Sequence, residues 1–552
     1  MVYGQDVIGL SEMQCTVCGN EYGEDDGSQL SLLRQGFVCF GQKRYAAAIA
    51  FYEKALQEPG QLDLEILLYL SEAYSAKHDF WQAAVTINKA CTLLNKLQDK
   101  GTRDFQRSIR IRQGMYNRVA GNMQQAAEGY RLAAELYAAE DYRERAGVYG
   151  SYLMVLAGLD MPLAEFQMAL AGYNEIFPVI GRPFPKGGHG AEKIRIGYIS
   201  PDFRQHVMYG FYYYMLFGYN RELFHVTCYS LSEVQDAYTR SIQDVVDGWR
   251  LAASLSLNEL ADAIRQDNID ILVDLAGHST GSGLPVFALR PAPVQISGLG
   301  WMETTGFAAT DYLLTDKYLD GEAEGYHSYL CEKPLFLSSQ FCYRAAEGLP
   351  DVDRAPCLKN GYITFGSFNS YHKITDEMVA VWSRILQQVP ESRLLLKCQV
   401  FLDESMQHEM AERFAEHGIE SWRLLLEPTS SDYMQRYLEI DIALDTYPYT
   451  GGGTTLDALY MGVPVVSRYG NRRSSRFGLS ILANAGLPWL AAADVQAYIK
   501  LAVALAGDRE LINDLHLNLR QLLVRSDVMN SRKYMKELEQ YYMAVLNCLQ
   551  EE

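Results

Sequence analysis

The sequence lacks the long hydrophobic runs that cross membranes, and it has little positive charge. No stretch reaches about 18 consecutive apolar residues, so we expect no membrane span. Asp and Glu (68) outnumber Lys and Arg (49), which leaves a net charge of −19. This balance argues against a general nucleic-acid binder. The first residues have neither a basic start nor an apolar core, so we also expect no signal peptide and a cytoplasmic location.

Cysteine is sparse as well. The chain has ten cysteines among 552 residues, and most of them are far apart in the sequence. Scattered cysteines fit reduced thiols in the cytosol. The exception is the pair Cys15 and Cys18, which has the spacing of half a zinc site. No second CxxC or HxxxH follows nearby, so a metal site and a plain thiol pair both stay open there.

A chain of this length holds several domains, and residues 30–145 carry a repeated helical pattern. Large apolar and small residues alternate at spacings of 3, 4 and 3, which places them on one helical face. The three stretches are Tyr45-Ala48-Tyr52-Ala55, Phe80-Ala83-Ile87-Ala90 and Met123-Ala126-Tyr130-Ala133. Gly36 and Gly114 lie nine residues before two of them, where a second helix would approach closely. The pattern resembles about three tetratricopeptide repeats, which stack into a superhelix with a concave face.

We expect this superhelix to dock a protein. The alternative is a spacer or a contact in a homo-oligomer, because the fold alone does not settle the function. Residues 1–29 form a separate N-terminal segment, and 146–190 form a helical linker. The linker ends in a stretch rich in Pro and Gly, 181–190, which marks a domain boundary.

Beyond the linker, apolar strands alternate with amphipathic helices. This alternation predicts parallel sheets that are covered by helices on both faces. One series of strands lies within 191–345 and a second within 355–525, and the polar connector 338–360 runs between them. The last segment, 526–552, is an amphipathic helix that we expect to pack back across the first half. The predicted fold class is therefore α + α/β, with helical repeats followed by two Rossmann-like, doubly wound halves.

Polar residues directly follow the predicted strands, where ligands bind in open α/β sheets. The candidates in the first half are Asp202, His206, His278 and Gly300, and those in the second half are Ser370, Lys373 and Tyr433. No GxGxxG follows the first strand and no GxxxxGK[S/T] occurs, so a dinucleotide dehydrogenase and a P-loop NTPase are both disfavoured.

The stretch 441–467 reads as strand, glycine-rich loop, helix and strand, with Asp457 in the first turn of the helix. Glycines and the free N–H groups of a helix N-terminus suit an anionic group, although a plain crossover between two strands is the alternative. A nearby lysine would neutralise a diphosphate without a metal. A nucleotide-sugar therefore fits, with its pyrophosphate on Thr454, Thr455 and Lys373 and its ribose on Asp457.

Six motifs carry a resemblance to a known family. They are PDFRQH (201–206), LVDLAGHSTG (272–281), FALRPAPVQISGLG (287–300), FNSYHK (368–373), DIALDTYPYTGGGTTLDALYMGVPVV (441–466) and SRFGLSIL (475–482). Together with the repeats before them, these motifs resemble the O-GlcNAc transferase and SPINDLY group of protein glycosyltransferases. The chain resembles a bacterial-type member of that group. The resemblance implies a GT-B catalytic region. It also implies inverting, metal-independent transfer of a sugar from a nucleotide donor to protein Ser or Thr, without a cofactor.

The same resemblance implies roles for single residues. Lys373 would bind the diphosphate and stabilise the leaving group, His206 would lie near the acceptor and the sugar, and Asp202 is a candidate proton carrier. The loop residues Gly453, Thr454 and Thr455 would contact phosphates, and Asp457 the ribose. Arg436 and the backbone of 428–430 would flank the base, and His278 would either orient the donor or serve the structure. These implied roles define the candidate site.

The chain departs from the family at several positions. It has Gly300-Trp301-Met302-Glu303-Thr304 where the family usually has Gly-Tyr-Pro-Gly-Thr, near the donor sugar. Ser370 and Ser430 stand where the animal enzymes have a glutamine and a lysine. Tyr149 stands where those enzymes have a histidine. We expect UDP rather than GDP as the nucleotide of the donor, and GlcNAc rather than glucose or fucose as its sugar. A non-catalytic repeat scaffold with a decayed transferase half is the alternative function.

The expected partners are a nucleotide-sugar and a protein acceptor docked on the repeats. An abundant secreted or surface protein, such as flagellin or an adhesin, would be modified before its export. No nucleic acid is expected.

Overall fold

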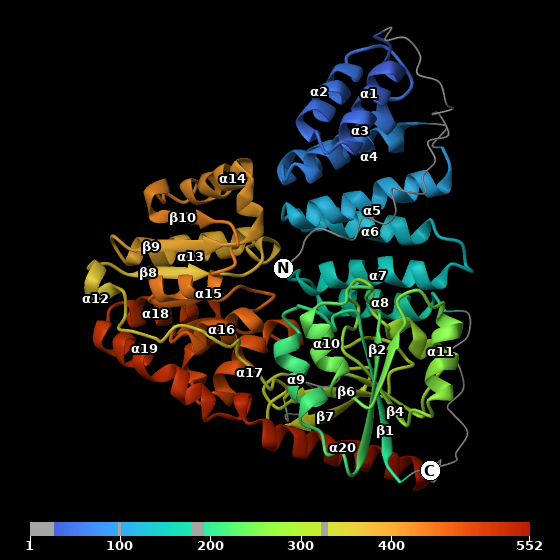
Figure 1. Ribbon diagram of the computed structural model, residues 1–552. Helices are drawn as coiled ribbons and strands as arrows, with labels where there is room; N and C mark the ends of the chain where they lie inside the picture. Colours follow the sequence, from blue (N-terminus) through green and yellow to red (C-terminus); the bar gives the residue numbers. More distant parts are fainter. Residues whose placement is uncertain (1–26, 98–100, 178–191, 322–328, 552) are drawn as a thin grey trace. The chain divides into compact units, whose positions relative to one another are not determined.

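The computed structural model describes residues 27–97, 101–177, 192–321 and 329–551 (Figure 1). The predictions for Cys15 and Cys18 and for the boundary at 181–190 therefore lie outside the described residues. The chain forms two compact units. The first holds the residues up to Leu136 together with Val400–Glu409, and the second holds Tyr137–Gln399 and Met410–Glu552. Among the described residues, no helix is both long and apolar enough to cross a membrane.

The first unit contains helices that pair as consecutive hairpins. Their bounds are α1 (Gln29–Gly41), α2 (Tyr45–Ala55), α3 (Asp63–Ala76), α4 (Phe80–Lys96), α5 (Arg103–Val119) and α6 (Met123–Glu135). Each odd-numbered helix packs against the even-numbered helix that follows it. The predicted repeat stretches coincide with α2, α4 and α6, whose small residues and central large residues are buried. The predicted helical repeats are thus confirmed.

Gly36 shows why the repeat needs its small residues. A Cβ at Gly36 in α1 would lie 2.1 Å from Cε1 of Tyr52, a fully buried ring of α2. Gly114 in α5 meets Tyr130 of α6 in the same way, at 2.7 Å. A glycine on one helix therefore makes room for a tyrosine on the next.

We expect Gly36→Ala to destabilise the first unit by about 1–3 kcal/mol, because the added methyl overpacks a well-filled contact. Gly41→Ala is the matched control, since a Cβ at Gly41, at the end of the same helix, meets no atom within 4 Å. Urea unfolding followed by far-UV circular dichroism compares the two variants. Equal unfolding midpoints for both would contradict this account of the hairpin.

The second unit begins with α7 (Tyr142–Ala157) and α8 (Leu163–Asn174) and continues with a seven-stranded parallel sheet. The strand order is β3-β2-β1-β4-β5-β6-β7. The strands are β1 (Ile194–Ser200), β2 (Phe224–Ser230), β3 (Gly248–Leu251), β4 (Ile271–Asp274), β5 (Val294–Ser297), β6 (Tyr312–Asp316) and β7 (Lys333–Leu337). The interleaved helices are α9 (Tyr209–Phe217), α10 (Ala237–Gln243) and α11 (Leu257–Gln266).

A second parallel sheet has six strands in the order β10-β9-β8-β11-β12-β13. The strands are β8 (Thr364–Ser367), β9 (Arg393–Lys397), β10 (Leu424–Glu427), β11 (Ile442–Leu444), β12 (Val465–Arg468) and β13 (Ala491–Ala492). The helices of this half are α12 (Cys357–Asn360), α13 (Asp376–Gln388), α14 (Glu404–Ala415), α15 (Tyr433–Arg436), α16 (Gly453–Tyr460), α17 (Phe477–Asn484), α18 (Val495–Ala506) and α19 (Arg509–Val524). The predicted fold class is confirmed, because helical hairpins precede two doubly wound parallel sheets.

The C-terminal helix α20 (Ser531–Glu551) returns to the first sheet, as the sequence predicts (Figure 1, red). The Glu537 carboxylate accepts a hydrogen bond from the backbone N–H of Ser338 at 2.8 Å. The hydroxyls of Tyr542 and Tyr198 lie 3.0 Å apart in the interior. The last helix therefore belongs structurally to the first half.

A buried ionic cluster around Arg473 joins the two α/β halves. Arg473, with no exposed surface, pairs with the carboxylate of Asp320. Its guanidinium also donates to the Thr315 hydroxyl at 2.8 Å and to the side-chain oxygen of Gln340 at 2.6 Å. The neighbouring Arg472 donates to the carbonyl of Ala157 at 2.7 Å, at the end of α7. The segment 472–476 thus holds both halves together.

Candidate active site

The glycine loop between β11 and α16 is organised by Asp445, the first residue after β11. Its carboxylate accepts hydrogen bonds from the backbone N–H groups of Gly451 (2.7 Å) and Thr446 (2.9 Å) and from the Ser467 hydroxyl (2.6 Å). Burial raises the pKa of Asp445, while these hydrogen bonds and the charge of Lys373 oppose the rise. The loop is therefore preorganised by a carboxylate that the sequence analysis did not single out.

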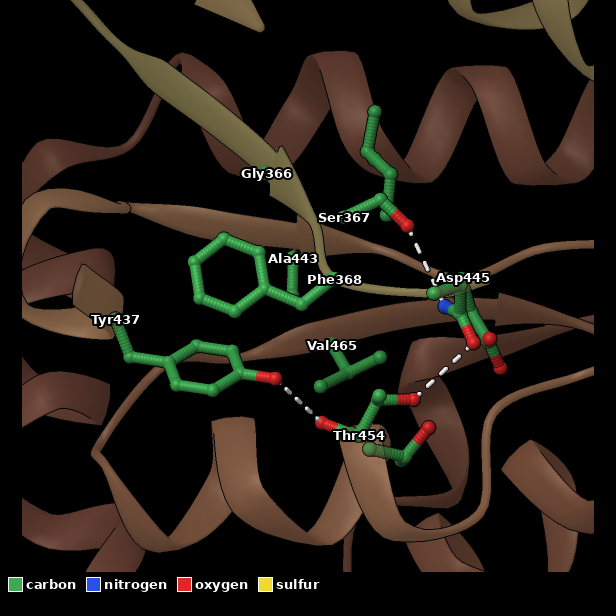
Figure 2. Close-up of a pocket in the computed structure, with 11 residues that line it drawn as sticks. Gly366, Ser367, Phe368, Tyr437, Ala443, Asp445, Thr454 and Val465 are labelled. Atoms are coloured by element: carbon green, nitrogen blue, oxygen red, sulfur yellow. Dashed lines mark hydrogen bonds between the residues drawn. The ribbon is translucent and has the colours of Figure 1, made fainter. Parts of the chain in front are cut away.

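Thr454 in the first turn of α16 is tied to the end of β8 (Figure 2). Its hydroxyl donates to the side-chain oxygen of Asn369 at 3.1 Å, and its carbonyl accepts from the Tyr437 hydroxyl at 3.2 Å. The Phe368 ring lies 4.3 Å from the ring of Tyr437, centroid to centroid, in the small pocket drawn in Figure 2. Thr455 is almost fully buried. Of the two threonines, Thr454 is the more accessible to a ligand.

Lys373 lies beside the glycine loop, as the sequence predicts. It closes a short 3-10 turn (Tyr371–Lys373) after β8, and Ser370 stands at the N-cap of that turn. The Lys373 ammonium donates to the carbonyl of Thr450 at 3.1 Å and lies 3.8 Å from the ring centroid of Tyr449. Burial lowers the pKa of Lys373 to about 8, and the carboxylate of Asp445 opposes that shift. The ammonium of a half-buried lysine thus stands where an anion on the loop would meet it.

Asp457 lies in the second turn of α16, one turn later than expected, because the helix already begins at Gly453. Its two carboxylate oxygens accept hydrogen bonds from the hydroxyls of Tyr343 (2.5 Å) and Tyr433 (3.0 Å). Burial raises the pKa of Asp457 to about 6, and both hydrogen bonds oppose the rise. Near neutral pH the group is therefore largely an ionised acceptor.

Arg436 forms a bidentate ion pair with Glu427. Its guanidinium donates to both oxygens of Glu427, at 3.0 and 2.6 Å. Both side chains are about a third exposed, so the ion pair fixes the arginine more than it stabilises the fold. The edge of the guanidinium that carries Nε and Nη2 is therefore occupied by this ion pair.

In the first half, His206 and Asp202 follow β1. Nδ1 of His206 lies 3.6 Å from an oxygen of Asp202, and it accepts a hydrogen bond from the backbone N–H of Met208 at 3.4 Å. Burial lowers the pKa of His206 and raises that of Asp202, and their mutual attraction opposes both shifts. The His206 side chain stays about a third exposed (32%). A largely neutral imidazole is therefore available at the surface of the site.

The two halves meet at this point. A Cβ at Gly453 would lie 3.0 Å from Cγ2 of Val207, the residue after His206. A Cβ at Gly452 would lie 3.9 Å from Cε of Met302. The structure thus brings the His206 loop, the 300–305 segment and the glycine loop together.

His278 is buried behind this surface rather than exposed on it. Its side chain is only 2% exposed, and Nε2 lies 2.7 Å from the carbonyl of Thr305. Burial lowers the pKa of His278 to about 4, so the ring is neutral. The ring of Trp301 lies 4.9 Å away in an edge contact. A Cβ at Gly300 would collide with the carbonyl of Leu275 at 1.8 Å, which explains the glycine there.

The three departing residues 301–303 have different surroundings. Trp301 is buried and donates from Nε1 to the carbonyl of Thr304 at 2.9 Å. Glu303 is buried too, and one of its oxygens lies 3.5 Å from Nε of Arg472 and accepts from the backbone N–H of Ser474 at 3.2 Å. Met302 is half-buried and faces the glycine loop. Within the departing stretch, Met302 is therefore the residue that lies nearest the glycine loop.

Four site residues were missed by sequence reasoning: Asn369, Asp445, Tyr437 and Tyr343. Asn369 and Asp445 carried a usable signal, since each stands at the end of an apolar strand. The tyrosines reach the site through tertiary contacts and had no local signal. Among the described residues, no group of three His, Cys, Asp or Glu side chains is arranged to hold a metal ion.

Comparison with known proteins gives one family. The model of glycosyl transferase family 41 matches residues 183–343 and 353–538. A barley (Hordeum vulgare) protein named probable UDP-N-acetylglucosamine--peptide N-acetylglucosaminyltransferase SPINDLY is 36% identical over 357 residues, which is 63% of this chain and 38% of the barley protein. Its Arabidopsis thaliana counterpart is 37% identical over 356 residues, again 63% of this chain and 39% of the relative. The chain thus spans less than two fifths of the length of these relatives.

A solved structure resembles almost the whole chain. A mutant of the Thermobaculum terrenum O-GlcNAc transferase superposes with a TM-score of 0.77 at 28% sequence identity. The match covers 95% of this chain and 98% of that protein. The likeness therefore includes the helical hairpins as well as both α/β halves.

Proposed function

Because this chain belongs to glycosyl transferase family 41, we propose that it moves a sugar from a UDP-sugar to Ser or Thr of a protein. The observation that carries the proposal is the ammonium of the half-buried Lys373 beside the glycine loop, which the loop after His206 meets from the other half through Val207. GlcNAc is the preferred sugar, since the relatives and the similar structure are named for its transfer.

The donor would lie across the glycine loop. The N-terminus of α16 and the Thr454 hydroxyl face the diphosphate, and Lys373 supplies the opposite charge. The Asp457 carboxylate accepts from the ribose, and Arg436 flanks the base. Ser370 and Tyr433 line the same region, while Gly300 and His278 support the segment that faces the sugar. No metal is needed in this arrangement, because the Lys373 ammonium and the N-terminus of α16 together offset the charge of the diphosphate.

The reaction is a displacement at the anomeric carbon. The acceptor hydroxyl oxygen forms the new bond on the face opposite the diphosphate, and the bond to the phosphate oxygen breaks, so the configuration inverts. Charge that develops on the leaving UDP is stabilised by Lys373 and by the helix N-terminus. The hydroxyl proton moves to a base, for which neutral His206 is suited and which Asp202 can support at 3.6 Å.

The helical hairpins would supply the acceptor contact. Stacked hairpins of this kind offer an extended surface to a polypeptide. We propose that an acceptor protein docks there, and that exported surface proteins such as flagellin or an adhesin are the class to examine first. A contact between copies of the chain is the competing use of the same surface.

A ligand panel tests the donor side of the proposal. Ligands that bind only the native state raise the melting temperature by mass action. We expect UDP and UDP-GlcNAc to raise the melting temperature of the wild-type protein, and GDP and GDP-fucose to leave it unchanged. A chain that responds to none of these ligands would instead support a repeat scaffold with a decayed transferase half.

A further inference from the structure

The segment Phe341–Arg344 crosses from the first half to the second and is fixed on both sides. The backbone N–H of Arg344 donates to the carbonyl of Gly210 in α9 at 2.7 Å, and that of Tyr343 donates to the carbonyl of Val528 at 2.8 Å. The ring of Phe341 lies 5.7 Å from Phe211 of α9, centroid to centroid. This crossing segment is therefore held against the helix that follows the His206 loop.

From this fixed segment Tyr343 reaches into the second half. Its hydroxyl donates to one oxygen of Asp457 at 2.5 Å, and its side chain is only 5% exposed. Tyr433 donates to the other oxygen, and Tyr437 is the further titratable group packed near the carboxylate. Asp457 is thus held by neutral hydroxyls rather than by a Lys or Arg. One hydroxyl belongs to the crossing segment and one to the nucleotide half.

A carboxylate in this setting is well suited to a sugar hydroxyl. Each carboxylate oxygen accepts more than one hydrogen bond, so a tyrosine on each oxygen fixes the rotamer and leaves further lone pairs for a ligand. A hydrogen bond from a neutral phenol leaves the negative charge of the carboxylate uncompensated, whereas the cation of a salt bridge would offset that charge. The position of the acceptor oxygens is therefore set by the two tyrosines.

We propose that Tyr343 is a positioning residue for the nucleotide: it orients the Asp457 carboxylate toward the ribose hydroxyls of the donor. The inference rests on the proposed function, because it takes the nucleotide to lie over α16. It adds that a residue of the crossing segment, outside the nucleotide half, sets the ribose contact. Binding of the donor ribose then depends on the contact between this segment and α9.

The test compares UDP with 2′,3′-dideoxy-UDP, which lacks the ribose hydroxyls, by calorimetry on the full chain. We expect the wild type to bind UDP more tightly than the dideoxy compound. In Tyr343→Phe the affinity for UDP falls about 10- to 100-fold, as for one lost hydrogen bond to a charged group. The affinity for the dideoxy compound changes little, so the variant loses most of the difference in affinity between UDP and the dideoxy compound. If Tyr343 had a merely structural role, the variant would bind both ligands more weakly by the same factor.

Tyr198→Phe is the matched control. It removes a buried hydroxyl that also bonds to another side chain, Tyr542, but in the first half and away from α16. This control should keep the wild-type discrimination. If Tyr343→Phe keeps the full wild-type discrimination, or weakens both ligands equally, the inference is wrong while the proposed function stands. If the wild type binds no UDP at all, the proposed function itself has failed.

Discussion

Lys373→Ala should lower kcat for sugar transfer about 100- to 1,000-fold, as expected for the loss of one preorganised donor to a developing anion. Lys373 is half-buried, lies against the Thr450 carbonyl and has Asp445 as its nearby counter-charge. Its ammonium is therefore fixed before the donor arrives. Lys533→Ala is the control, because that lysine is exposed and pairs with Asp527 away from the glycine loop. Steady-state kinetics with a UDP-sugar measures both variants.

The same lysine predicts a pH dependence. The pKa of Lys373 is lowered to about 8 by burial, and the charged form is the one that binds phosphates. At pH 7 most of the free protein therefore carries the charge. Above pH 8, kcat/KM for the donor should fall about tenfold per pH unit as the ammonium deprotonates. A profile that stays flat to pH 10, or equal activity of Lys373→Ala and wild type, would contradict the role of this residue.

Arg473→Met should destabilise the second unit by about 3–5 kcal/mol. The change keeps much of the side-chain volume but leaves the carboxylate of Asp320 buried without its counter-charge. The double variant Arg473→Met with Asp320→Leu should recover most of the loss, because a matched apolar pair has no charge to desolvate. Tryptophan fluorescence during urea unfolding reports mainly on this unit, since Trp81 is the one tryptophan in the first unit.

Arg131→Met provides the comparison for an exposed ion pair. Arg131 and Glu135 are about half exposed and lie one helical turn apart, so the loss should stay below about 1 kcal/mol. Because Arg131 lies in the first unit, urea unfolding of this variant is followed by far-UV circular dichroism. If Arg473→Met costs no more than Arg131→Met, then the buried cluster does not hold the two halves together.

The repeats could be predicted from the sequence because their signal is local. Small residues at Ala48, Ala83 and Ala126 recur at helical spacing, and each is fully buried against a neighbouring helix. The strands β1 and β9 were equally readable, as continuous apolar runs typical of a sheet covered on both faces.

Three edge strands were not predicted, namely β3, β7 and the two-residue β13, and the composition of β3 and β7 explains why those two were missed. β3 (Gly248–Leu251) is largely exposed, and β7 (Lys333–Leu337) contains Pro334, a residue tolerated only where a strand lacks a full set of neighbours. Neither shows the apolar run of a central strand. Both pair as strands because the sheet provides an edge for them.

The candidate site was predictable where residues stand at strand ends. Lys373 and Thr454 lie at the glycine loop as expected, and Val207, the residue after His206, meets Gly453 from the other half. The hydrogen bonds that fix them were not predictable. Tyr343 reaches Asp457 over 114 positions of sequence, and a contact of that kind depends on how two folded halves meet. The partial burial of Met302 and the full burial of Glu303 likewise required the structure.

The most direct test of the central claim is transfer to protein. The purified chain is incubated with UDP-GlcNAc and a lysate of the cells that make it, and peptides are analysed by mass spectrometry. We predict Ser and Thr peptides that carry one N-acetylhexosamine with the wild type and not with Lys373→Ala. No modified peptide with any UDP-sugar, or equal modification by both proteins, would contradict the assignment of this chain as a protein O-glycosyltransferase that acts through Lys373.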